Sequence, residues 1–185
     1  MNYVKPVLIE RLNRVSPPNA IIIRDFLLFC LDKKIPLNTC DTVYHQIKYY
    51  KTHYREEFMK KGISFRNIER VMQVAERKIK NFLAKIKIHE SLLETRYSEV
   101  KNFFIRFIDD KRMINLMKKK ESSSPLPEDS DMKIFSKALS FPELWFVTTD
   151  GHFKELTNEI EKAFTIELVT DDNAFRKKDK LSSCL

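Results

Sequence analysis

Glycine is almost absent from this chain: of 185 residues only Gly62 and Gly151 are glycines. Loops that cradle phosphates with backbone N–H groups need several glycines close together. Neither a P-loop nor a GxGxxG dinucleotide turn can therefore be built here. This excludes nucleotide-dependent kinases, ATPases and Rossmann dehydrogenases from the candidate functions.

Cysteines and long apolar segments are also scarce. Cys30, Cys40 and Cys184 lie far apart without a CxxC pair, which excludes a disulfide scaffold or a zinc ribbon and favours a reducing compartment. The longest apolar stretches, 20–23 and 26–31, are far shorter than the ~18 residues of a membrane span. The first residues carry no apolar core of a signal peptide. We therefore expect a cytoplasmic protein without a membrane partner.

Positive charge is concentrated in the middle of the chain. Residues 48–120 hold 20 Lys and Arg against 9 Asp and Glu, whereas the whole chain has a net charge of +8. A basic segment of this kind indicates a polyanionic partner, of which nucleic acid is the commonest. A well-solvated helical surface is the alternative. With 43% hydrophobic residues, the chain can nevertheless bury a real core.

Apolar periodicity predicts short strands that alternate with helices. The expected strands are 4–9, 35–39, 144–149 and 165–170. Such alternation predicts an α/β fold, a three-layer domain around a parallel sheet of at least four strands. Ile9, Thr39, Thr149 and Thr170 should then lie near one edge. We expect a single domain over 1–176 and a flexible tail over 177–185.

A long helical insert, about 64–120, should separate the second and third strand units. Ser64 can cap its first helix, and Asp109-Asp110 should interrupt the second. The apolar stripes predict that 66–88 and 92–117 pack as a helical pair. The side chains expected at their contact are Val71, Ile79, Phe82, Val100, Phe104 and Phe107.

The last third of the chain carries the most informative pattern. The segment Asp131-Met-Lys-Ile-Phe-Ser-Lys-Ala138 precedes the apolar run Leu144-Trp-Phe-Val, which leads into Thr148-Thr-Asp150-Gly-His-Phe153. This arrangement resembles the C-terminal half of PIN-domain nucleases: Asp-x-x-Ile-x-x-x-Ala, an apolar strand, then Thr-x-Asp and an aromatic residue. The resemblance covers about 1–50 and 125–175.

PIN-family members are, as a rule, Mg²⁺- or Mn²⁺-dependent ribonucleases whose carboxylates hold the metal. The resemblance implies that Asp131 and Asp150 are catalytic metal ligands, supported by Thr148 or Thr149. Two such carboxylates repel, so at least one should have a raised pKa without metal. Each aspartate also has a purely structural interpretation, Asp131 in a first helical turn and Asp150 as the cap of a turn.

The first half departs from the family pattern. The strand that should end in Asp instead places Glu10 there, which we take as the third catalytic and metal-binding carboxylate; an alignment shifted to Val4 would destroy the site. The usual Glu of the early helix falls on Gln46, or on His45, and Gln46 would only support a bound water. The chain is therefore expected to be either an endoribonuclease or a catalytically degenerate PIN-like domain that binds RNA or a protein partner.

Basic side chains follow one flank of the 66–88 segment. Arg70, Arg77, Lys78 and Lys85 lie off its apolar stripe, where they could grip an RNA backbone; a solvated face is the alternative. The four histidines have no metal-ligand spacing and are expected to be packed or solvated. A homodimer is plausible by family analogy alone. A helical interaction protein, in which the α/β part is only a scaffold, is a third possibility.

Overall fold

The computed structural model describes residues 18–60, 62–89, 94–119, 123–141 and 145–184. The chain forms two compact units, one of residues 1–90 and 178–185 and the other of residues 91–177. The expected strand 4–9, with Ile9 and Glu10, lies outside the described residues. None of the described helices is both long enough and apolar enough to cross a bilayer.

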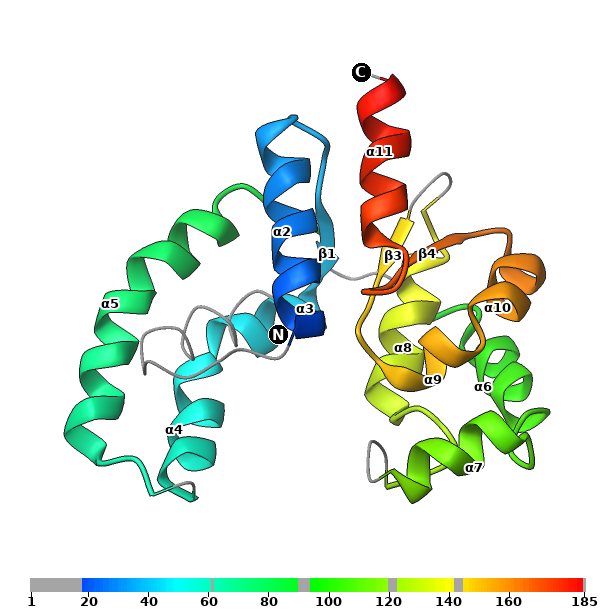
Figure 1. The fold of residues 1–185 in the computed structure, drawn as a ribbon, viewed down its shortest axis with the longest axis horizontal. Coiled ribbons are helices and arrows are strands. Elements are labelled where there is room, and N and C mark those ends of the chain that lie inside the picture. The colour runs from blue at the N-terminus through cyan, green and yellow to red at the C-terminus, as the bar shows by residue number, and fades with distance from the viewer. Residues whose placement is uncertain (1–17, 61, 90–93, 120–122, 142–144, 185) are drawn as a thin grey trace. The chain divides into compact units, whose positions relative to one another are not determined.

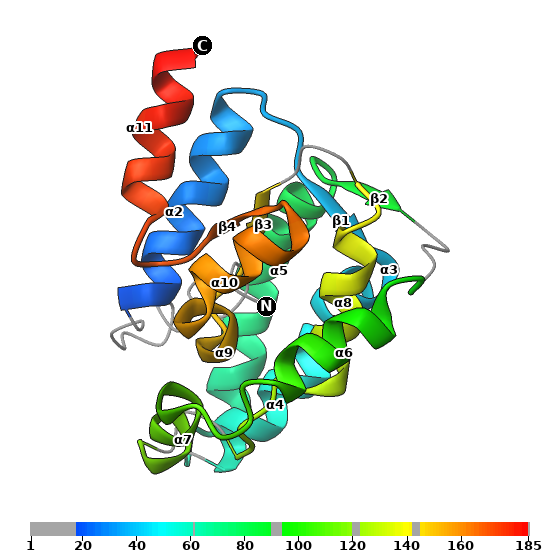
Figure 2. The same cartoon turned by 90° about the vertical axis from the view of Figure 1, so that its right-hand side faces the viewer.

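Among its described residues, the first unit contains helices and one pair of short strands (Figures 1 and 2). Strands β1 and β2 pair in parallel, with Thr39 opposite Ile88. A parallel pair needs a long crossover, and three helices supply it. The elements are α2 (Pro18–Asp32), β1 (Asn38–Cys40), α3 (Asp41–Lys48), α4 (Tyr50–Lys60), α5 (Phe65–Leu83) and β2 (Lys87–His89).

The core of this unit lies between α4 and α5, which are neighbours in Figure 1. Helix α5 starts as expected, because the Ser64 hydroxyl accepts a hydrogen bond from the Asn67 N–H (3.4 Å). Gly62 precedes it with a φ of 73°, a conformation that favours glycine. The buried side chains are Ile47, Tyr50, Tyr54, Phe58, Ile68, Val71, Met72, Ala75, Ile79 and Phe82.

The described part of the second unit is also mainly helical, with one parallel strand pair. Phe146 of β3 lies opposite Leu168 of β4. Helices α6 and α8 run side by side, as Figure 2 shows. The elements are α6 (Tyr97–Ile105), α7 (Lys111–Lys118), α8 (Asp129–Ala138), β3 (Trp145–Val147), α9 (Gly151–Glu155), α10 (Thr157–Phe164), β4 (Glu167–Val169) and α11 (Ala174–Cys184), whose last residues belong to the first unit.

Phenylalanine rings form the centre of the second core. Phe135 is fully buried and lies 5.0–5.3 Å, centroid to centroid, from Phe146, Phe153 and Phe164. These edge-to-face contacts join α8, β3, α9 and α10. The core thus fixes the helix that carries Asp131 relative to the turn that carries Asp150.

Part of the predicted α/β architecture is present. The chain combines helices with parallel strands, and β1, β3 and β4 fall within or next to the expected segments. Among the described residues the strands form two separate two-stranded sheets, not one sheet of four strands. Strand β2 was not anticipated: α5 ends at Leu83, and the expected end of the helix at 88 is wrong.

The predicted packing of 66–88 against 92–117 as a pair is also wrong. Val71, Ile79 and Phe82 of α5 are buried in the first core, whereas Val100 and Phe104 of α6 are buried in the second. Each apolar stripe is satisfied by helices of its own unit. The interruption at Asp109-Asp110 is confirmed, because Asp110 caps α7 by accepting a hydrogen bond from the Arg112 N–H (2.8 Å).

The segment expected as a flexible tail, 177–185, lies largely within α11. Its first residue, Lys177, is buried, and its ammonium group contacts Glu167 (2.6 Å) and Glu161 (3.6 Å). The same group lies 5.2 Å from the centre of the Trp145 ring. These contacts attach the start of α11 to the second unit, and single-domain organisation over 1–176 stays a prediction.

Candidate functional site

Asp150 lies three residues beyond β3 and forms the N-terminal cap of α9. Its Oδ1 atom accepts hydrogen bonds from the backbone N–H of His152 (2.9 Å) and of Phe153 (3.4 Å). Its own N–H donates to the Thr148 hydroxyl (3.1 Å). The structural interpretation of Asp150 as a cap is therefore confirmed, and the same contacts hold its carboxylate at the end of the strand.

Asp131 lies in the first turn of α8 and is half-buried. Burial, then the charge of Asp150, then that of Glu128 raise its pKa from 3.8 to about 6. A helix N-terminus favours a charged carboxylate, so desolvation and two neighbouring acids outweigh that effect here. No described residue donates a hydrogen bond to this carboxylate. Asp131 therefore has a raised pKa, as expected for at least one of the two carboxylates, but burial is a larger cause than the charge of Asp150.

His152 links Asp150 to the loop that precedes α8. Its buried ring lies with Nδ1 3.1 Å from Asp150 Oδ1 and Nε2 3.0 Å from the Ser124 carbonyl oxygen. Burial works against the charged ring, but hydrogen bonds to Asp150 and Ser124 prevail and raise the pKa of His152. Each ring nitrogen faces an acceptor oxygen, so the hydrogen bond on each side needs a proton on that nitrogen.

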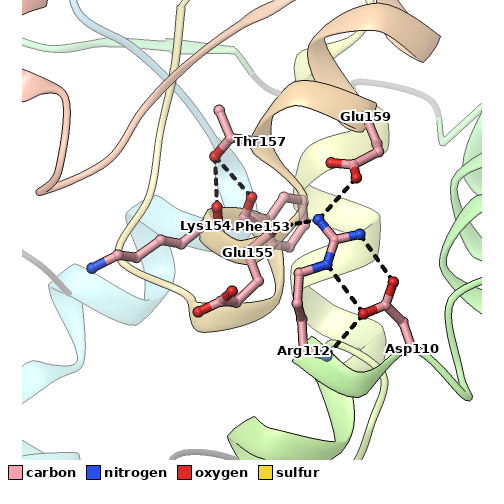
Figure 3. Close-up of polar contacts among 7 residues, drawn as sticks. All are labelled: Asp110, Arg112, Phe153, Lys154, Glu155, Thr157 and Glu159. Atoms are coloured by element: carbon pink, nitrogen blue, oxygen red, sulfur yellow. Dashed lines mark hydrogen bonds and ion pairs between the residues drawn. The ribbon is translucent and has the colours of Figure 1, made fainter.

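The far end of α9 is held by Arg112 of α7 (Figure 3). The Arg112 guanidinium donates to the Glu155 carbonyl oxygen (2.9 Å), contacts Glu159 of α10 (2.8 Å) and forms a two-point ion pair with Asp110. The Thr157 hydroxyl reinforces the α9–α10 junction by contacting carbonyl oxygens of α9. Helix α9, and with it Asp150, is therefore fixed at both ends.

Two further features place α9 next to its neighbours. Gly151 has no side chain, and a Cβ there would lie only 3.0 Å from Leu116 Cδ2, so α7 can approach the turn closely. Lys154 forms ion pairs with Asp171 (2.9 Å) and Asp172 (3.0 Å), which follow β4. Because β3 and β4 are parallel, these acids and Asp150 follow the same edge of the pair.

The donor set at Asp131 and Asp150 suits a hard divalent cation. Both side chains offer carboxylate oxygens, the ligands that Mg²⁺ and Mn²⁺ prefer. Burial and then the charge of Asp150 raise the pKa of Asp131, and a cation would offset both effects. Within the described ranges, no three His, Cys, Asp or Glu side chains gather closely enough to hold a metal ion. Glu10, the predicted third ligand, lies outside those ranges.

The residues predicted to support the metal ligands, Thr148, Thr149 and Gln46, do not all lie beside the two aspartates. Thr148 is buried, accepts the Asp150 N–H and donates its own N–H to the Val169 carbonyl oxygen (3.0 Å). Thr149 is half-buried between Thr148 and Asp150. Gln46 is exposed on α3, which belongs to the first unit, whereas both aspartates belong to the second.

The predicted RNA-binding residues are exposed on or just beyond α5. Arg70, Arg77, Lys78 and Lys85 form no hydrogen bond or ion pair with described residues. The acids of the same helix are already paired, Glu69 with Arg55 and Glu76 with Lys51 and Lys80. Helix α5 therefore presents cationic side chains whose charge is not neutralised locally.

The sequence-based reasoning missed the contribution of His152. It placed all four histidines in packed or solvated roles because their spacing matches no metal site. The position of His152, two residues after Asp150, could have indicated this contact. An aspartate that caps a turn commonly accepts a hydrogen bond from the backbone N–H two residues later. The contribution of Glu128 to the pKa of Asp131 could also have been anticipated from the sequence, since the two acids are separated by one helical turn.

Comparison with known proteins returned no match to a family model, to a curated protein or to a solved structure. The PIN resemblance thus depends on the residues from Asp131 to Phe153.

Proposed function

We propose that this chain is a PIN-like, metal-dependent endoribonuclease that uses Mg²⁺ or Mn²⁺. The observation that carries the proposal is the pair formed by Asp131 and Asp150. One acid begins a helix and the other follows a parallel strand, and the charge of Asp150 contributes to raising the pKa of Asp131. Half-buried acids with a strongly perturbed pKa are concentrated at functional sites.

In the proposed enzyme, Asp131, Asp150 and Glu10 hold the cation through carboxylate oxygens. The bound metal supplies an activated water and stabilises charge on the phosphate. Thr148 orients the Asp150 backbone, and the exposed cations of α5 bind the RNA backbone. The finer elements of the proposal are a three-layer PIN-like domain around a parallel sheet, a cytoplasmic location and a homodimer.

A second candidate is a degenerate PIN-like domain that binds RNA or a protein partner without cutting. It is favoured by the lack of a third metal ligand beside Asp131 and Asp150 within the described residues. The unpaired cations of α5 would serve this function equally well. The two candidates differ only in metal-dependent chemistry.

The test is cleavage of a set of single-stranded RNAs by the full chain with Mn²⁺, with Mg²⁺ and with excess chelator. We expect cleavage that needs the metal and that is lost in Asp131→Asn and Asp150→Asn. Asp109→Asn is the matched control, because Asp109 is an exposed acid that is not among the groups shifting the pKa of Asp131. RNA binding by all variants should remain.

Two results distinguish the candidates. If the wild-type chain binds RNA but no metal produces cleavage, the degenerate binding domain is the better account. If cleavage persists with chelator or in both site variants, the proposed site is wrong.

A further inference from the structure

His152 connects the two halves of the acidic site. Its ring contacts the Asp150 carboxylate on one side and the Ser124 carbonyl oxygen on the other (3.1 and 3.0 Å). Ser124 belongs to the loop that leads into α8, where Asp131 lies in the first turn. One buried ring thus spans the gap between the turn that carries one acid and the loop that precedes the other.

The two carboxylate oxygens of Asp150, Oδ1 and Oδ2, differ in their hydrogen bonds. All the hydrogen bonds that described residues donate to this carboxylate, including that from the His152 ring, reach Oδ1. A carboxylate held in this way has a fixed orientation and keeps Oδ2 for another ligand. Residues that orient a metal ligand through a hydrogen bond contribute to metal affinity although they do not touch the metal.

We propose that His152 is a positioning residue: its Nδ1–H fixes Asp150 Oδ1 and thereby presents Oδ2 to a divalent cation shared with Asp131. This inference rests on the proposed function, because it assigns a role at the same site. It assigns the contact with Ser124 a separate role, which is to anchor the loop before α8.

Two substitutions separate these contacts. In His152→Asn the amide nitrogen takes the place of Nδ1 and can keep the hydrogen bond to Asp150. In His152→Gln the longer side chain places its amide nitrogen near the position of Nε2 and can keep the hydrogen bond to Ser124. Both variants lose the imidazole and any charge on it, so comparing one with the other isolates the contact with Asp150.

The measurement is Mn²⁺ affinity of the full chain, followed by the electron paramagnetic resonance signal of the free ion. We expect His152→Gln to bind Mn²⁺ at least roughly tenfold more weakly than His152→Asn, the lower end of the range for such supporting contacts. Equal affinities, or weaker binding by His152→Asn, would overturn the proposal, since loop anchoring would then be the role of His152.

A measurement on the wild-type chain keeps the test valid if a variant does not fold. The ring Nδ1–H signal of His152, followed by NMR during a Mg²⁺ titration, should shift with the same saturation as metal binding. An unchanged signal at saturation contradicts the proposal. If the wild-type chain binds neither ion, the proposed function fails as well; if it binds Mn²⁺ but the variants do not differ, only the role of His152 fails.

Discussion

Asp150 and Asp131 are electrostatically coupled: the charge of Asp150 adds to burial in raising the pKa of Asp131 to about 6. The coupling joins residues from two elements, the N-terminus of α8 and the turn after β3. At neutral pH the charged, half-buried Asp131 lowers the free energy of unfolding, and a bound cation would offset this cost. The first two predictions follow from this cost.

Asp131→Asn should stabilise the chain at high pH. The folded protein binds a proton at Asp131 between pH 3.8 and about 6, where the unfolded chain has released it. The free energy of unfolding of the wild type therefore falls as the pH rises through this range, and the variant lacks this fall. We expect the variant to be more stable by on the order of 1–2 kcal/mol at about pH 8, allowing for solvent at this half-buried group, and equal below about pH 4. Urea unfolding across this pH range measures the difference, and a constant difference would contradict the assigned cause.

Mn²⁺ should stabilise the unit of residues 91–177 in the wild type. A ligand that binds only the folded state adds about 2.7 kcal/mol at a hundredfold excess over its dissociation constant. Asp131→Asn and Asp150→Asn should lose most of this gain, whereas Asp109→Asn should keep it. Scanning calorimetry with and without the ion measures the effect. Equal stabilisation of all variants would place the metal elsewhere.

Arg112→Lys should weaken the junction of α7, α9 and α10. The guanidinium reaches Asp110, Glu159 and the Glu155 carbonyl oxygen together, whereas one ammonium group cannot match this geometry. We expect a loss of roughly 1–2 kcal/mol in the free energy of unfolding, since the side chain is partly exposed. Arg77→Lys on the exposed face of α5 is the control and should change stability by less than about 0.5 kcal/mol. Equal effects would show that the junction does not depend on the guanidinium.

Neutralising four exposed cations on or just beyond α5 should weaken RNA binding and its dependence on salt. For single strands each phosphate contact contributes about 0.7 to the slope of log affinity against log salt concentration, so replacing all four by Gln should lower the slope by up to about 3. The altered residues are Arg70, Arg77, Lys78 and Lys85.

A control with the same change in charge replaces four exposed cations outside this face. Those residues are Lys60, Lys111, Lys162 and Arg176. If both quadruple variants lose the same amount of binding, net charge alone attracts the RNA and α5 has no special role.

Local pattern determined most of the secondary structure. Helical spacing of apolar residues predicted α5, and Ser64 was recognised as its cap. The interruption at Asp109-Asp110 was anticipated, and the apolar run before Thr148 predicted β3. These features depend on residues within one or two turns of each other, so the sequence contains the information directly. Strand β2 was missed because 87–89 directly follows a strongly helical stripe.

Which stripes pack together was decided only by the tertiary structure. Both α5 and α6 carry an apolar stripe, and pattern alone could not show that Tyr54 covers the first while Phe135 packs with the second. Hydrophobic burial is not directional, so many pairings of such faces satisfy the same pattern.

The candidate site shows the same division. The sequence by itself determined that Asp131 begins a helix and that Asp150 follows a strand. Only the tertiary structure decided that these acids influence each other and that His152 connects Asp150 to Ser124, 28 positions earlier in the chain. The reason is physical: desolvation and charge coupling depend on distances through space, which spacing along the chain does not fix.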